Sequence, residues 1–221
     1  MVDFAALRRN MIDTQLRTYD VTSKRLLDAV ESVDRQHFVP ESMVGLTYVD
    51  QSVALTASDG QTRVLLQPMV LSRMLQAVDI QIGDAILDIA GGSGYTAAIM
   101  AAMGGKVTTL ESSVPISDLA IAALQKAGLD TISIRTGDLL AGAPNTAPFD
   151  VIFVNGAVES DPSLLLAQLA EGGRLVVVMG GGRAGRVVLF NKTGDIIGRR
   201  VVFDAAAPFV EISPIKAAFH F

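Results

Sequence analysis

The segment that most constrains the fold of this chain runs from Ile86 to Tyr95 and reads Ile-Leu-Asp-Ile-Ala-Gly-Gly-Ser-Gly-Tyr. It joins an apolar strand to a glycine-rich turn, and an apolar helix begins near Tyr95. Glycines let a backbone turn sharply and approach a ligand closely, and a helix N-terminus presents free N–H groups. This order is typical of the first strand–turn–helix unit of a nucleotide-binding, doubly wound α/β fold.

Two kinds of ligand suit this turn. Residues 92–97 match the G-x-G-x-x-A pattern of dinucleotide sites, and Glu111 follows at about the expected distance. For S-adenosylmethionine the pattern begins with an acid on the strand, here Asp88, and continues as D-x-A-x-G-x-G to Gly94. A carboxylate at the strand end suits the positive amino group of that donor better than it suits a pyrophosphate. We therefore favour S-adenosylmethionine over a dinucleotide, and either ligand over a plain strand-to-helix turn.

Acidic side chains also follow the next two predicted strands, at the edge where doubly wound sheets bind ligands. Residues 106–110 are predicted to form the second strand, and Glu111 at its end suits the two ribose hydroxyls. Residues 132–135 are predicted to form the third strand, and Asp138 follows it at a position suited to the adenine amino group. Each acid alone is more often a turn or helix-cap residue. Their recurrence at successive strand ends favours a binding site.

Apolar spacing predicts the remaining elements. Helices are predicted over 4–17, over 22–33 with Thr22 as N-cap, from Met69 onward and over 162–169; strands over 151–154 and 174–179, with a hairpin formed by 187–190 and 196–203 and a closing strand at 209–212. Residues 36–66 are predicted to be rich in loops. Asp150 precedes its strand and is interpreted as structural. The cluster Gly180–Gly182, with Arg183 and Arg186, is interpreted as a hairpin entry, because no Lys-Ser/Thr pair follows it.

Composition excludes several classes of function. The 221 residues are 50% apolar, which is enough for one three-layer α/β domain. The net charge of −5 and the lack of a basic block argue against nucleic acid or an anionic membrane as partner. The chain has no cysteine, and its two histidines, His37 and His220, show no metal-ligand spacing, so we expect no metal site. No signal peptide or long apolar run is evident, and a cytoplasmic location is expected.

Several segments beyond the glycine motif resemble the protein-L-isoaspartate O-methyltransferase family. Residues 8–17 resemble the opening helix of that family and residues 33–40 its run into the substrate region; the pieces 48–50, 60–62, 67–68, 147–150, 168–169 and 172–175 match in order. The resemblance covers nearly the whole chain. It implies methyl transfer from S-adenosylmethionine to the free carboxylate of isoaspartyl residues in damaged proteins.

The resemblance also implies a fold and a donor site. The fold is a Rossmann-like S-adenosylmethionine-dependent methyltransferase fold, a doubly wound, mostly parallel sheet with an N-terminal helical extension and a C-terminal antiparallel hairpin. Residues 1–221 form a single methyltransferase domain, with 1–66 as N-terminal helices and substrate loop and 67–221 as cofactor core. The implied donor-binding residues are Asp88, Ala90, Gly91, Gly92, Ser93, Gly94, Glu111, Ser112, Gly137 and Asp138.

The chain departs from the family at the reacting centre. The family has Gly-Gln-Thr-Ile-Ser-Gln-Pro, whereas residues 60–68 here contain two extra residues and place Leu66 where the family has serine. A leucine cannot hydrogen-bond a carboxylate, so Thr62, Ser58 and Thr56 are the candidates for a replacement hydroxyl. The departure leaves open two alternatives: a relative that methylates another acceptor, and a non-catalytic module that binds S-adenosylmethionine.

Overall fold

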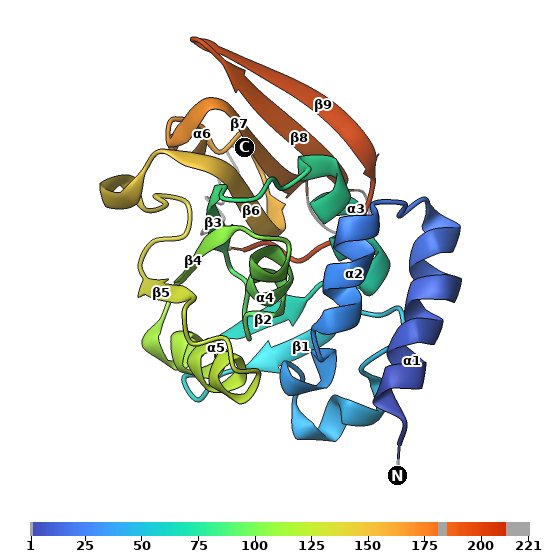
Figure 1. Ribbon diagram of the computed structural model, residues 1–221. Coiled ribbons are helices and arrows are strands. Elements are labelled where there is room, and N and C mark those ends of the chain that lie inside the picture. The colour runs from blue at the N-terminus through green and yellow to red at the C-terminus, as the bar shows by residue number, and fades with distance from the viewer. Residues whose placement is uncertain (1, 181–184, 211–221) are drawn as a thin grey trace, which may run out of the picture.

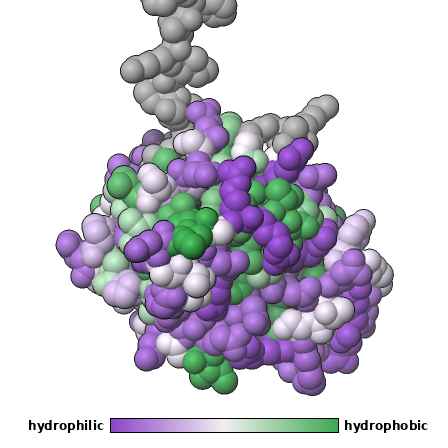
Figure 2. Space-filling view, turned by 90° about the horizontal axis from the view of Figure 1, so that it is seen from above, coloured by the Kyte–Doolittle hydropathy of each residue, from purple (hydrophilic) through white to green (hydrophobic). Residues whose placement is uncertain are grey.

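The computed structural model describes residues 2–180 and 185–210 (Figure 1). Three features named above lie wholly or partly outside these ranges: residues 181–183 of the glycine cluster and its arginine, residues 211–212 of the expected closing strand, and His220. Within the described part of the chain, no helix is long and apolar enough to cross a membrane. Figure 2 shows a face on which hydrophilic side chains surround smaller groups of apolar ones.

A seven-stranded sheet of order β5-β4-β3-β6-β7-β8-β9 forms the centre of the fold. The parallel strands are β3 (Ala85–Ile89), β4 (Lys106–Glu111), β5 (Ser133–Thr136), β6 (Phe149–Val158) and β7 (Leu169–Met179); β8 (Arg186–Thr193) and β9 (Ile196–Asp204) continue the sheet as an antiparallel hairpin. The predicted fold class is confirmed. β3 lies between two parallel neighbours and is covered by one core on each face of the sheet, so its residues are buried on both faces and almost all apolar.

Alternate residues of the parallel strands pack into two separate cores. Ile86, Val151 and Phe153 face the core that also receives the N-terminal helices. Leu87 and Ile152 face the other core, which is closed by residues 139–169. This alternation follows from the two-residue period of a strand.

Helices cover the sheet, and further helices form the N-terminal part of the chain (Figure 1). They are α1 (Phe4–Met11), α2 (Lys24–Ser32), α3 (Pro68–Val78), α4 (Tyr95–Ala102), α5 (Val114–Lys126) and the short α6 (Ser163–Leu166). A π-helical turn and a 3-10 turn continue α1 to Tyr19, which accounts for the predicted helix over 4–17.

Two predicted helix boundaries were wrong. The N-cap of α2 is Ser23, whose hydroxyl accepts the N–H of Leu26, and the side-chain oxygen of Gln76 accepts the backbone N–H groups of both Thr22 and Ser23 ahead of the helix. The helix predicted over 162–169 ends at Leu166 because β7 already begins at Leu169.

The loop-rich prediction for residues 36–66 was wrong in part, because it missed a β-hairpin. Strand β1 (Val53–Thr56) pairs antiparallel with β2 (Thr62–Leu65) in a two-stranded sheet separate from the main one. Residues of β1 alternate between buried and exposed, the pattern of a half-buried strand. Gly60, with φ of +80°, lies in the turn, where a left-handed conformation suits glycine.

A buried arginine fixes the segments that flank this hairpin. Arg35 is fully buried; its Nε donates to the carbonyl of Thr47 at 3.0 Å and its Nη2 to the carbonyl of Leu66 at 3.2 Å. Its guanidinium also lies 4.7 Å from the ring centroid of Tyr95, the first residue of α4. The N-terminal region is thereby connected to the helix that follows the glycine turn.

Candidate functional site: the carboxyl edge of the sheet

The glycine turn between β3 and α4 has the conformation that its sequence predicts. Ala90, Gly92 and Gly94 have positive φ of 58°, 64° and 87°. A Cβ on Gly91 would lie 2.3 Å from an oxygen of Asp88, so only glycine fits above that carboxylate. Ala90 holds a left-handed conformation at a cost of about 1 kcal/mol, which a glycine would avoid.

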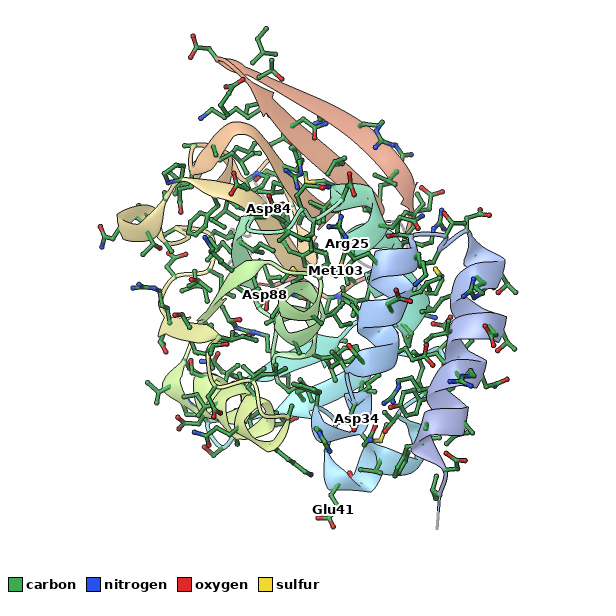
Figure 3. The ribbon with its side chains drawn as sticks, viewed as in Figure 1. Arg25, Asp34, Glu41, Asp84, Asp88 and Met103 are labelled. Carbon is green, nitrogen blue, oxygen red and sulfur yellow. The ribbon has the colours of Figure 1, made fainter. Side chains whose placement is uncertain are left out.

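Asp88 lies in the interior at the end of β3 (Figure 3). Its Oδ1 accepts the Nδ2 of Asn155 at 2.7 Å, and its Oδ2 accepts the hydroxyl of Thr109 at 3.3 Å. Burial, reinforced by the charge of Glu111, raises the pKa of Asp88 to about 7, although the two hydrogen bonds oppose the rise. The position of Asp88 beneath the glycine turn agrees with the motif.

Asn155 is a candidate site residue that the sequence analysis missed. It lies on β6, is buried, and also accepts the hydroxyl of Thr96 from α4 at 2.6 Å. One amide side chain thus joins β6, the carboxylate on β3 and the first turn of α4. The signal was a polar residue directly after the apolar run of residues 151–154.

Glu111 at the end of β4 is buried and already has two partners. Its Oε1 accepts the backbone N–H of Gly92 at 2.6 Å, which ties the glycine turn to the neighbouring strand. Its Oε2 accepts the Nε of Arg63 at 2.8 Å, and the side chains are 0% and 10% exposed. Burial raises the pKa of Glu111, and the charge of Arg63 opposes that rise.

Arg63 comes from β2, so the missed hairpin contributes directly to this edge. Its Nη2 also donates to the hydroxyl of Ser112, which in turn donates to the side-chain oxygen of Gln61 at 2.7 Å. The sequence analysis did not assign Arg63 or Gln61 a role. The indication in the sequence was a lone arginine within a short apolar segment.

Gly137 and Asp138 follow β5, as predicted. The N–H of Gly137 donates to the carbonyl of Glu111 at 2.8 Å, which brings the ends of β4 and β5 together. Asp138 is exposed, and its Oδ1 accepts the N–H groups of Leu140 and Ala141, both at 2.9 Å. The ten predicted donor-binding residues therefore lie at one edge of the sheet.

The three candidate hydroxyls lie at the turn end of the hairpin. Thr56 and Thr62 are direct partners across β1 and β2, and Ser58 is exposed in the connecting turn. Thr56 also lines a pocket of about 300 Å³ between the hairpin and α5, together with Ser93 of the glycine turn and Lys126.

Leu66 has a different environment from these hydroxyls. Its side chain is only 2% exposed and belongs to the core beneath the N-terminal helices. The residue aligned with the family serine thus contributes to packing.

This packing yields a stability prediction for Leu66→Ser. We expect the free energy of unfolding to fall by about 2 to 3 kcal/mol, because a buried leucine is lost and a hydroxyl enters an apolar site. We also expect no gain in methyl transfer, since position 66 faces the core. Urea unfolding and a transfer assay measure the two effects; a stable variant with increased transfer would contradict both.

A glycine turn after the central strand, with acids at the neighbouring strand ends of a mostly parallel seven-stranded sheet, defines a Rossmann-like methyltransferase. A family model described as "Protein-L-isoaspartate(D-aspartate) O-methyltransferase (PCMT)" matches residues 7–211. The chain belongs to the protein-L-isoaspartate(D-aspartate) O-methyltransferase family. The predicted resemblance and the predicted enzyme class, a methyltransferase that uses S-adenosylmethionine, are thereby confirmed.

Individual relatives agree with this assignment. A protein-L-isoaspartate O-methyltransferase of Roseiflexus sp. (strain RS-1) is 37% identical over 196 residues, 89% of this chain and 88% of that protein. One of Koribacter versatilis (strain Ellin345) is 38% identical over 180 residues, 81% of this chain and 79% of that protein.

Solved structures agree as well. A protein-L-isoaspartate O-methyltransferase superposes with a TM-score of 0.81 at 26% identity over 91% of this chain, which spans 65% of that longer chain. A putative protein-L-isoaspartate O-methyltransferase from Plasmodium falciparum, solved with S-adenosyl-L-homocysteine, gives a TM-score of 0.77 at 17% identity and covers 96% of this chain and 99% of that one. At that identity the second match supports the fold alone.

Proposed function

We propose that this chain methylates the free carboxylate of isoaspartyl residues in damaged proteins, with S-adenosylmethionine as the donor. The observation that carries the proposal is the family match over residues 7–211, combined with the carboxyl edge built by Asp88, the glycine turn and Glu111. When bound, the donor supplies an electrophilic methyl group whose leaving group is a neutral thioether.

The residues at this edge suit that donor. Gly92 and Gly94 have positive φ, which lets the backbone turn sharply at the point where a ligand would approach it. Glu111 offers a carboxylate for paired hydroxyls, and the N-terminus of α4 opens at the glycine turn. We assign the donor's ribose to Glu111 and Ser112 and its adenine to Gly137 and Asp138. We assign its amino group to Asp88.

The acceptor needs little acid–base assistance from the protein. A carboxylate is ionised at neutral pH and is itself the nucleophile, so no proton has to be removed before transfer. The rate then depends on alignment and on exclusion of water. The two threonines at the turn end of the hairpin, Thr56 and Thr62, are the hydroxyls that we expect to orient the acceptor in place of the family serine.

The second candidate function is methylation of a different carboxylate. Leu66 leaves this alternative open, because its buried side chain provides no hydroxyl at the position of the family serine, but the family match and the names of the relatives do not favour it. In that case the donor side is unchanged, and only the choice of acceptor differs.

The experiment that tests the proposal is methyl transfer from labelled S-adenosylmethionine to an isoaspartyl peptide, with its aspartyl twin as control. We expect transfer to the isoaspartyl peptide only. Donor binding, followed by calorimetry, separates the candidates: binding without isoaspartyl-dependent transfer favours another acceptor.

Asp88→Ala tests the donor site within the same experiment. We expect S-adenosylmethionine binding to weaken by about 1.5 to 3 kcal/mol, the scale of a hydrogen bond to a charged group. An Asp195→Ala variant in the exposed turn between β8 and β9 serves as the control. Unchanged donor affinity in a folded Asp88→Ala protein would reject the assigned position of the amino group.

A further inference from the structure

The β1–β2 hairpin contacts the same atoms that the donor would need. Arg63 occupies one oxygen of Glu111, and its Nη2 occupies the hydroxyl of Ser112, the two groups assigned above to the ribose. Gln61 accepts the hydroxyl proton of Ser112. The ribose position is therefore filled by side chains of the chain itself.

The hairpin also covers the glycine turn. A Cβ built on Gly92 would lie 2.6 Å from Cδ1 of Leu55 and 3.2 Å from Cβ of Arg63. Both strands of the hairpin thus pack directly on the backbone that the donor must approach, because Leu55 belongs to β1 and Arg63 to β2. A ligand cannot enter between the two surfaces while these contacts persist.

The Arg63–Glu111 ion pair differs from most others in its burial. Most ion pairs in the described part of the chain are between exposed side chains, whereas these two are 10% and 0% exposed. Arg63 donates its Nε to one oxygen of Glu111 and its Nη2 to the hydroxyl of Ser112, so one guanidinium occupies both groups assigned to the ribose hydroxyls. Arg63 is in this sense an internal substitute for the ribose.

We propose that Arg63 competes with the donor for Glu111, so that S-adenosylmethionine binds only after the β1–β2 hairpin has moved away from the glycine turn. This inference rests on the donor site of the proposed function. It makes Arg63 a determinant of donor affinity, because the observed affinity is reduced by the fraction of molecules in which the hairpin covers the site. The candidate hydroxyls Thr56 and Thr62 move with the same hairpin, so donor entry and acceptor positioning are coupled.

Arg63→Gln tests the competition. Glutamine still donates a hydrogen bond but has no charge, so the covered state is weakened, and we expect S-adenosylmethionine to bind at least about fivefold more tightly than to the wild type. Arg9→Gln, which removes an exposed ion pair with Glu31 on α2, is the matched control and leaves the dissociation constant unchanged. Unchanged or weaker binding to a folded Arg63→Gln protein would overturn the proposal, the weaker case making Arg63 a ligand of the donor.

A second measurement does not depend on substitution of Arg63. The chain has no cysteine, so spin labels attached through Ser58→Cys in the hairpin turn and Asp118→Cys on α5 report one distance. We expect that distance to lengthen when S-adenosyl-L-homocysteine saturates the site. A bound ligand with an unchanged distance would overturn the inference and leave the donor site intact, whereas failure of both the wild type and Arg63→Gln to bind S-adenosylmethionine would reject the donor site itself.

Discussion

Glu111→Ala is expected to lower the free energy of unfolding by about 3 to 5 kcal/mol, the cost of leaving a buried charge without its partner. In the wild type, the carboxylate of Glu111 is fully buried against Arg63 and the N–H of Gly92. Removal of the carboxylate leaves a guanidinium that is only 10% exposed without its ion-pair partner, and leaves the N–H of Gly92 without its acceptor. Urea unfolding followed by circular dichroism gives the difference directly.

Two comparisons separate the buried charge from simple loss of packing. Glu111→Met combined with Arg63→Met replaces both charges with apolar side chains of similar length, and we expect the double variant to recover about 2 kcal/mol relative to Glu111→Ala. Asp204→Ala removes the partner of Arg186 at the exposed sheet edge and is expected to change stability by less than about 0.5 kcal/mol. If Glu111→Ala costs no more than Asp204→Ala, the buried pair contributes nothing to the folded state.

Local sequence predicted the parts of the site that lie within one strand–turn–helix unit. Asp88, the glycine turn and the N-terminus of α4 are consecutive in the chain, so one motif describes them. Glu111 and Gly137 were also predicted, because the ends of parallel strands fall at one edge of the sheet whatever lies between them.

Contacts between segments that are far apart in the sequence could not be predicted from local motifs. Arg63 meets Glu111 across 48 positions of sequence, and Asn155 meets Asp88 across 67. Four-residue strands such as β1 and β2 carry too few alternations to stand out from a loop, so the hairpin was missed and its contacts with it. The buried position of Leu66 likewise depends on Arg35 and on the N-terminal helices, which no local pattern relates to residue 66.

The stability of the protein is expected to fall as pH rises through the titration of Asp88. Its pKa is about 7 in the folded protein and has an ordinary value of 3.8. Between these values the folded state retains a proton that the unfolded state has lost, so the free energy of unfolding decreases with pH and levels off above about 7. The two pKa values correspond to a loss of about 3 to 4 kcal/mol between pH 4 and pH 8 from this one group.

Asp88→Asn isolates this contribution. Asparagine keeps the shape of the side chain and cannot ionise, whereas Glu111, the neighbouring acid whose pKa burial also raises, remains in both proteins. Urea unfolding at intervals from pH 4 to pH 8 should therefore give a steeper decline for the wild type than for the variant, with the two curves parallel above about pH 7. Parallel curves over the whole range would mean that Asp88 is ionised throughout. The glycine turn would then cover a permanent charge, and the donor's amino group would meet a carboxylate that needs no deprotonation.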